Sequence, residues 1–263
     1  MREAWRGIRG TIRYMVPRPS RLAHAAIAAL LVAGVVATGG AARQDDLTPQ
    51  HAGPRIVAIG DIHGAYQPLT SLLRETGLLD DQGRWAGGTT TLVQTGDYTD
   101  RGAAIRPVMD LLMTLERQAA AAGGRVIVLL GNHETMNLTR LLQDTSPAAI
   151  ASFADDRSET RRANAYAQYV KWAQSRRRAL GRDGPEVQTE EAWMQAHPPG
   201  LIEYLEAFGP DGTYGRWLRE KEVAVEVEGT VFLHGGLNPD HAASRLSDVN
   251  KRVRAVVMWL AEH

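Results

Sequence analysis

Short apolar runs alternate with amphipathic stretches through the first half of the chain. Residues 55–59, 90–95 and 125–130 are rich in β-branched and aliphatic side chains, as is typical of buried strands. Apolar residues recur at helical spacing over residues 68–75 and 107–122. Strands that alternate with helices in this way predict a layered α/β fold with parallel strands.

A polar, glycine-containing loop follows each of these runs, and a fourth run at residues 230–233 ends in the same way. The loops are Gly-Asp-Ile-His-Gly at 60–64, Gly-Asp-Tyr-Thr-Asp-Arg-Gly at 96–102, Gly-Asn-His-Glu at 131–134 and His-Gly-Gly-Leu-Asn-Pro at 234–239. A single Gly-Asp pair is an ordinary turn, because both residues favour turns. In open α/β sheets, however, ligands bind beyond the carboxyl ends of the strands. Four such loops therefore predict a shared binding site at one edge of the sheet.

The middle of the chain has a different composition. Residues 141–208 are rich in Ala, Arg, Gln and Glu and poor in β-branched residues, which favours helices. We expect a helical insert at about residues 145–222, which would cover the site and select the substrate. The arginines at 161–162 and 176–178 are interpreted as part of a solvated helical face rather than a nucleic-acid surface.

An arginine-rich start precedes an apolar segment without charged residues at 25–42, and small residues close that segment. This order is typical of a secretory signal peptide, with an uncleaved membrane anchor or a buried helix as alternatives. We expect a signal peptide at residues 1–42 and a linker at 43–54. The body would then be exported to the periplasm or secreted, and only an uncleaved segment would hold it in a membrane.

Charge is distributed unevenly along the chain. The formal net charge of the whole chain is zero, but seven arginines and one acid lie in residues 1–43, which leaves residues 44–263 with a net charge of −6. An acidic body gives no electrostatic reason to expect nucleic-acid binding. The chain has no cysteine, which excludes disulfides, thiolate metal ligands and a cysteine nucleophile.

The four loops resemble those of the phosphoprotein phosphatases, the Ser/Thr protein phosphatase superfamily of metallophosphoesterases. That family's motifs G-D-x-H-G, G-D-x-x-D-R-G and G-N-H-E are present in this order, followed by its H-G-G-L-x-P element. The run GNHETMNL at residues 131–138 is most similar to the bacterial, Shewanella-like branch. The resemblance covers roughly residues 54–263. It implies a calcineurin-like fold at residues 55–263, in which helices flank a β-sandwich.

The resemblance also implies a centre of two divalent metal ions, with Mn²⁺ favoured and Fe or Zn²⁺ as alternatives. Asp61 and His63 would bind the first metal, and Asp97 would bridge the two. Asn132 and His234 would bind the second. Oxygen and nitrogen ligands without thiolates suit hard or borderline divalent ions. Two such ions can acidify a shared water and clamp the oxygens of a phosphoryl group.

Catalytic roles follow from the same resemblance. A metal-bridging hydroxide would attack phosphorus, and His133 would act as the general acid that protonates the leaving oxygen. Asp100 would orient His133. Arg101 and Asn132 would bind the phosphate, for which the guanidinium fork of arginine is well suited.

Each motif residue also has a structural interpretation. Aspartates are common in turns, histidines at strand ends occur as core residues, and Arg101 could form a surface ion pair with Asp100. Glu134 is interpreted as structural, and Tyr98 as a packing or rim residue. Three further histidines are interpreted as surface residues: His51, His197 and His241. Because ligand-type residues recur in all four loops, we favour the site.

One departure from the family's pattern lies near the C-terminus. The family uses a further histidine for the second metal, many tens of residues after the H-G-G motif. Only His241 and His263 follow here, and neither position fits. We therefore expect that the chain stops before the domain is complete, with a degenerate second metal site as the alternative.

The function expected from these features is hydrolysis of phosphate monoesters, with phosphorylated Ser, Thr or Tyr of proteins as the favoured substrates. A small-molecule or nucleotide phosphatase is one alternative. A non-catalytic metal-binding remnant is the other, although the acid and phosphate positions are intact.

Overall fold

A three-stranded parallel sheet forms the centre of the domain. The computed structural model describes residues 55–180, 184–239 and 244–262. Strands β1 (Ile56–Ile59), β2 (Thr91–Gln94) and β3 (Arg125–Val128) lie in that order, with β2 in the middle. The apolar runs predicted all three strands, and the α/β prediction is confirmed.

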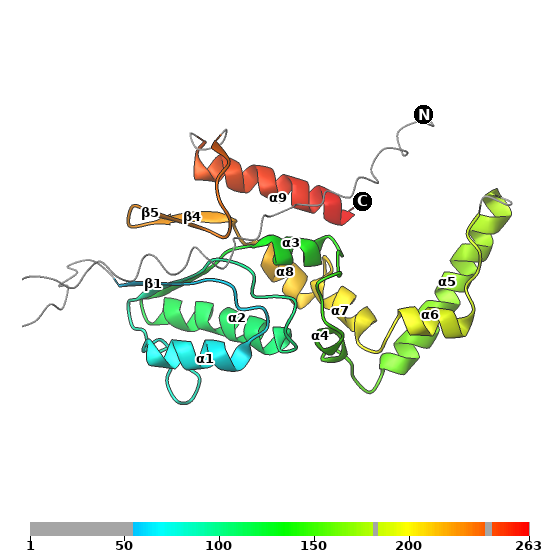
Figure 1. The fold of residues 1–263 in the computed structure, drawn as a ribbon, viewed down its shortest axis with the longest axis horizontal. Helices are drawn as coiled ribbons and strands as arrows, with labels where there is room; N and C mark the ends of the chain where they lie inside the picture. The colour runs from blue at the N-terminus through cyan, green and yellow to red at the C-terminus, as the bar shows by residue number, and fades with distance from the viewer. Residues whose placement is uncertain (1–54, 181–183, 240–243, 263) are drawn as a thin grey trace, which may run out of the picture. The chain divides into compact units, whose positions relative to one another are not determined.

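Two helices cover one face of this sheet. Helix α1 (Tyr66–Glu75) connects β1 to β2, and α2 (Ile105–Ala121) connects β2 to β3, both on the same side (Figure 1). Leu92 of β2 lies in the core that these helices form with the sheet, and the neighbouring Val93 belongs to a second apolar cluster. This alternation is the period-2 pattern of a strand that is covered on both faces.

A β-hairpin covers the other face. Strands β4 (Ala224–Val227) and β5 (Thr230–Leu233) pair antiparallel, and Val227 packs with Val93 and Leu129. Glu228 and Gly229 connect the strands, both with positive φ (49° and 75°), as in a two-residue hairpin turn. The pattern of four apolar runs predicted one sheet edge for all four loops, and the structure differs here, because this turn pairs residues 230–233 with β4 in a second sheet.

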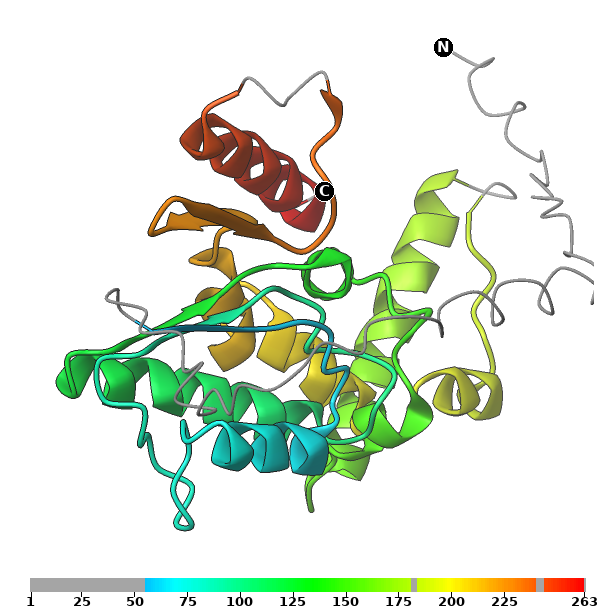
Figure 2. The ribbon, with the colours of Figure 1, turned by 60° about the vertical axis from the view of Figure 1, so that its left-hand side comes forward.

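Helix α9 (Leu246–Glu262) forms the outermost layer, beside the hairpin (Figure 2). The buried Asn250 of α9 forms hydrogen bonds with the backbone at the start of β4. Its side-chain oxygen accepts hydrogen bonds from the backbone N–H groups of Val223 and Ala224, and its amide donates to the Ala224 carbonyl. The layers are therefore helices, parallel sheet, hairpin and helix, as in a β-sandwich flanked by helices.

Helices occupy most of the region for which an insert was predicted. They are α4 (Pro147–Ala151), α5 (Ser158–Leu180), α6 (Glu190–Ala196), α7 (Leu201–Phe208) and α8 (Thr213–Arg219). Figures 1 and 2 show α7 and α8 next to the body and α5 extending away from it. The arginines at 176–178 are exposed near the C-terminal end of α5, which agrees with a solvated helical face. That interpretation is wrong for Arg162, because its side chain is buried and donates hydrogen bonds to the backbone carbonyls of Met194 and His197.

None of the helices in the described ranges has both the length and the apolar character that a membrane crossing needs. The predicted signal peptide and linker at residues 1–54 lie outside the described residues, as do His241 and His263.

Candidate metal centre

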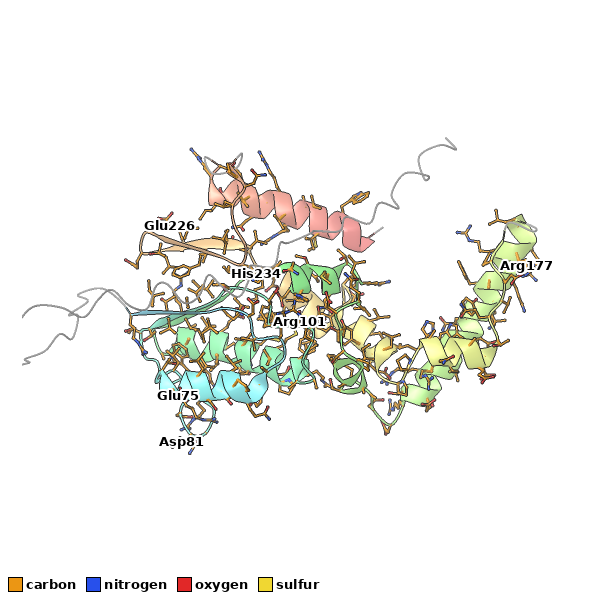
Figure 3. All side chains as sticks on the ribbon, viewed as in Figure 1. Glu75, Asp81, Arg101, Arg177, Glu226 and His234 are labelled. Atoms are coloured by element: carbon orange, nitrogen blue, oxygen red, sulfur yellow. The ribbon has the colours of Figure 1, made fainter. Side chains whose placement is uncertain are left out.

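Four loops meet beyond the carboxyl ends of β1, β2, β3 and β5. These loops carry all the predicted site residues. In Figure 3 the labelled residues Arg101 and His234 show where the loops meet, beside α3 (Asn132–Leu138). The prediction that the fourth loop joins the other three holds for its position. This fourth loop follows β5 of the hairpin and not a strand of the parallel sheet.

Asp97 lies at the centre of this arrangement. The Nε2 atoms of three histidines surround its Oδ2 atom: His234 at 3.1 Å, His133 at 3.7 Å and His63 at 3.8 Å. Its Oδ1 atom accepts a hydrogen bond from the backbone N–H of His133 at 3.2 Å. A buried carboxylate with an oxygen facing three imidazoles suits a shared ligand for two cations.

His63 has a ring that is oriented for a ligand. Its Nδ1 atom lies 3.0 Å from the carbonyl oxygen of Thr99, which only accepts, so Nδ1 carries the proton and Nε2 is free to bind. The Nε2 atom is buried and has no hydrogen-bond partner in the structure. A buried polar atom without a partner costs free energy, and coordination of a cation would remove that cost.

Asp61, Asn132 and His234 complete the group. His234 Nδ1 lies 3.7 Å from a carboxylate oxygen of Asp61, and His234 Nε2 lies 3.2 Å from the amide oxygen of Asn132. Asp61, Asp97 and His234 could hold one ion, and His63, Asp97 and His133 a second. These imidazole, carboxylate and amide groups fit Mn²⁺, Fe or Zn²⁺.

The predicted general acid has the expected partner. His133 is buried, and its Nδ1 atom lies 2.9 Å from Oδ2 of the fully buried Asp100. On the other side of the ring, Nη2 of Arg101 lies 3.1 Å from Nε2. Arg101 itself is exposed, so its guanidinium can turn toward a ligand. The surface ion pair considered for Arg101 and Asp100 is not the arrangement observed, because the Asp100 side chain faces His133.

The backbone of these loops adopts unusual conformations. Four of the site residues have positive φ: His63 (45°), Asp97 (57°), Asp100 (63°) and Arg101 (58°). Such values are strained for residues other than glycine and concentrate at functional sites. Hydrogen bonds between the loops compensate: the N–H groups of Ile62 and His63 both donate to the Asp97 carbonyl at 2.9 Å.

Glu134 holds the second and third loops together, as its structural interpretation predicted. Its carboxylate accepts hydrogen bonds from the N–H groups of Asp97, Tyr98, Thr99 and Gly131 and from the Thr99 hydroxyl, all at 2.8–2.9 Å. Burial raises the pKa of the Glu134 carboxyl, whereas these hydrogen bonds favour the ionised form.

Replacing Glu134 with glutamine is expected to lower the free energy of unfolding by about 3–5 kcal/mol, the cost of breaking a buried charged network. Each carboxylate oxygen faces at least two donors, so an amide NH₂ in either orientation would face donors as well. Urea denaturation would measure the loss. The exposed Glu75→Gln variant is the control and should change stability by less than about 0.5 kcal/mol. Equal stability of both variants would contradict a structural role for Glu134.

Two other interpretations from the sequence have different outcomes. Tyr98 is fully buried and packs against Trp217 with ring centroids 5.8 Å apart, so it is a packing residue and not a rim residue. His197 is half-buried and stacks on Trp193 at 3.9 Å. The surface interpretation of His197 therefore holds only in part, because one face of the ring covers the indole.

Comparison with known proteins identifies the class to which this fold and site belong. Residues 54–255 match the model of the calcineurin-like phosphoesterases, and the chain belongs to this family. Two of its relatives are Shewanella-like protein phosphatases. The chain is 31% identical to Shewanella-like protein phosphatase 2 of Arabidopsis thaliana over 210 residues, covering 76% of this chain and 51% of the relative. It is 28% identical over 200 residues to Shewanella-like protein phosphatase 1 of Plasmodium berghei, covering 76% and 44%.

Solved structures agree with this assignment. The cold-active protein-tyrosine phosphatase of a psychrophilic Shewanella species superimposes with a TM-score of 0.54 at 26% identity, covering 78% of this chain and 50% of that one. The chain thus spans about half the length of the relatives that it matches. A family of metallophosphoesterases implies divalent metal ions, and the residues described above fit them.

Proposed function

We propose that this chain carries the catalytic centre of a metal-dependent phosphomonoesterase that acts on phosphorylated Ser, Thr or Tyr side chains of proteins. The observation that supports this most strongly is the buried Asp100–His133 pair beside the candidate metal ligands, with Arg101 at the His133 Nε2 atom. The phosphatase names of the relatives support the same reaction class.

Two divalent ions, proposed as Mn²⁺, would be held by Asp61, His63, Asp97, Asn132 and His234 and would supply an acidified water and positive charge for the phosphoryl oxygens. Arg101 and the side-chain amide of Asn132 would bind the oxygens of the phosphate group next to these ions. A guanidinium donates two parallel hydrogen bonds to such a group. Asn132 begins α3 and is exposed, so its side chain is accessible to a ligand.

His133 would protonate the leaving oxygen of the ester through Nε2. Because Nδ1 faces the Asp100 carboxylate, Nε2 is the ring nitrogen that remains for proton transfer. The contact between Arg101 and Nε2 must open when a phosphate binds, since the guanidinium would then follow the phosphate oxygens. Binding of the substrate would therefore also free the Nε2 atom of His133 from its contact with Arg101.

The full 263-residue chain, supplied with Mn²⁺, is expected to release inorganic phosphate from phosphopeptides. Peptides that carry phosphoserine, phosphothreonine or phosphotyrosine should be compared with 5′-nucleotides and simple sugar phosphates at equal concentration. Phosphopeptides should have the higher kcat/KM, and omission of the metal should abolish turnover.

Two results would contradict the proposal. A preference for nucleotides or sugar phosphates would identify a small-molecule phosphatase. Tight metal binding by isothermal titration calorimetry without turnover of any ester would indicate a non-catalytic metal-binding protein.

A further inference from the structure

The Asp100 carboxylate is held from three directions, and only one of the three partners, His133, lies in the four loops that carry the candidate site. Oδ2 lies 2.9 Å from His133 Nδ1 and also accepts a hydrogen bond from the side-chain amide of Asn137 at 3.0 Å. Oδ1 accepts a hydrogen bond from the Thr145 hydroxyl at 2.7 Å. The carboxylate is fully buried, so these contacts replace water.

Asn137 is in turn oriented by the helical insert. Its amide oxygen accepts a hydrogen bond from the hydroxyl of Tyr204 in α7, 67 residues away in the chain. Its amide nitrogen then faces acceptors only, including Asp100 Oδ2 and the His133 carbonyl at 2.9 Å. If the amide turned over, its oxygen would face the Asp100 carboxylate, and the Tyr204 hydroxyl disfavours that orientation.

The ring of Tyr204 is fixed by its surroundings. It is fully buried, and its ring centroid lies 4.8 Å from that of Phe153 and 4.6 Å from that of Phe208. Burial raises the pKa of the Tyr204 phenol well above its usual range, so the hydroxyl stays protonated and can donate. The insert therefore presents a rigid donor to the third loop.

We propose that Thr145, Asn137 and Tyr204 are positioning residues that fix the Asp100 carboxylate, and with it the orientation of the His133 ring. Through Tyr204, the helical insert is coupled to the general acid. This inference rests on the proposed function, in which His133 protonates the leaving oxygen. Thr145 and Asn137 both donate to Asp100, and Tyr204 donates to Asn137. The Asn137 amide also donates to the His133 carbonyl and to the Thr99 hydroxyl, but none of these hydrogen bonds ends on the side chain of Asp61 or His63, so their effect reaches the reaction through Asp100 and His133.

The chain offers a closely matched pair of variants, Tyr204→Phe and Tyr214→Phe. Both tyrosines are buried, both pack against Phe153 and Phe208, and each donates one hydrogen bond. The Tyr214 hydroxyl donates to Asp110 at 2.8 Å, which is not part of the site. Phenylalanine keeps the ring packing in both cases and removes only the hydroxyl.

The first measurement is kcat with two esters. A serine phosphate has a poor leaving group that needs a proton, whereas 2,4-dinitrophenyl phosphate has a leaving group that does not. Tyr204→Phe is expected to lower kcat about 10-fold with the phosphoserine peptide and less than about 2-fold with the aryl ester, as loss of an orienting partner would. Tyr214→Phe should leave both unchanged. Thr145→Val should resemble Tyr204→Phe, and Thr145→Ser, which keeps the hydroxyl, should restore activity.

The second measurement is independent of activity. In the metal-free chain labelled with ¹⁵N-histidine, the Nδ1–H proton of His133 should give a low-field NMR signal, because it donates to a buried carboxylate. Tyr204→Phe should shift or broaden this signal, and Tyr214→Phe should not. If the parent chain hydrolyses no ester, the proposed function fails while the NMR comparison still tests the positioning. Equal behaviour of the two variants in both measurements would overturn the inference.

Discussion

Replacing Asp97 with asparagine is expected to abolish metal-dependent phosphatase activity and to leave the protein with little bound metal. The carboxylate has Oδ2 within 3.1–3.8 Å of three imidazole nitrogens, so one residue serves both possible groups of ligands. Asparagine keeps the size and can still accept the His133 N–H, but it replaces the charge with a neutral amide. We expect kcat/KM to fall by at least about 10³-fold, which corresponds to about 4 kcal/mol of transition-state stabilisation.

Metal content, measured by mass spectrometry after gel filtration, separates this explanation from unfolding. The Asp97→Asn variant should keep the far-ultraviolet circular dichroism of the parent chain while it loses metal. Asp81→Asn, a substitution in an exposed loop, is the control and should change neither quantity. A variant at Asp97 that retained both metal and activity would show that the metal centre lies elsewhere.

The position of the site could be predicted because the residues that form it lie next to the apolar runs in the sequence. Each loop directly follows an apolar run, and parallel strands deliver their carboxyl ends to one edge of a sheet. The sequence alone therefore predicts that the candidate ligands Asp61, Asp97 and Asn132 lie close together. Their roles came from the resemblance to a known family, because spacing alone does not separate a ligand from a turn residue.

The second sheet could not be predicted in the same way. The run at residues 230–233 is as short and apolar as the strands of the parallel sheet, and periodicity carries no information about strand direction. Its pairing depends on the turn at Glu228 and Gly229 and on a preceding strand, Ala224–Val227, that contains a charged residue. The hairpin packs on Val93 and Leu129, which is a tertiary contact.

The residues that hold Asp100 also lie beyond sequence reasoning. Thr145 and Tyr204 are 45 and 67 residues from the partners to which they donate, and no local pattern distinguishes them from other polar residues of the insert. A signal was present only for Asn137, which is four residues after His133 and so lies on the same face of α3. The insert was expected to cover the site, but its link to the proposed general acid depends on tertiary contacts that the sequence pattern does not encode locally.

Replacing His133 with glutamine is expected to affect substrates according to their leaving groups. General acid catalysis contributes about 10²–10⁴-fold, and it does so only where the leaving oxygen needs a proton. We therefore expect kcat to fall by about 10²–10⁴-fold with a phosphoserine peptide and by less than about 10-fold with 2,4-dinitrophenyl phosphate. Asp100→Asn should show the same selectivity with a smaller loss, because the ring loses its orienting charge but keeps its proton-carrying nitrogen.

Metal content distinguishes this role from the other one that the geometry allows. His133 Nε2 lies 3.7 Å from Asp97 Oδ2, and His133 forms one possible group of ligands together with His63 and Asp97. If His133 were a ligand, His133→Gln would lose metal and would be impaired equally with both esters. If it is the general acid, the variant keeps its metal and the loss depends on the leaving group. The position of Arg101, 3.1 Å from the same nitrogen, favours the acid, because a guanidinium and a metal ion would repel each other there.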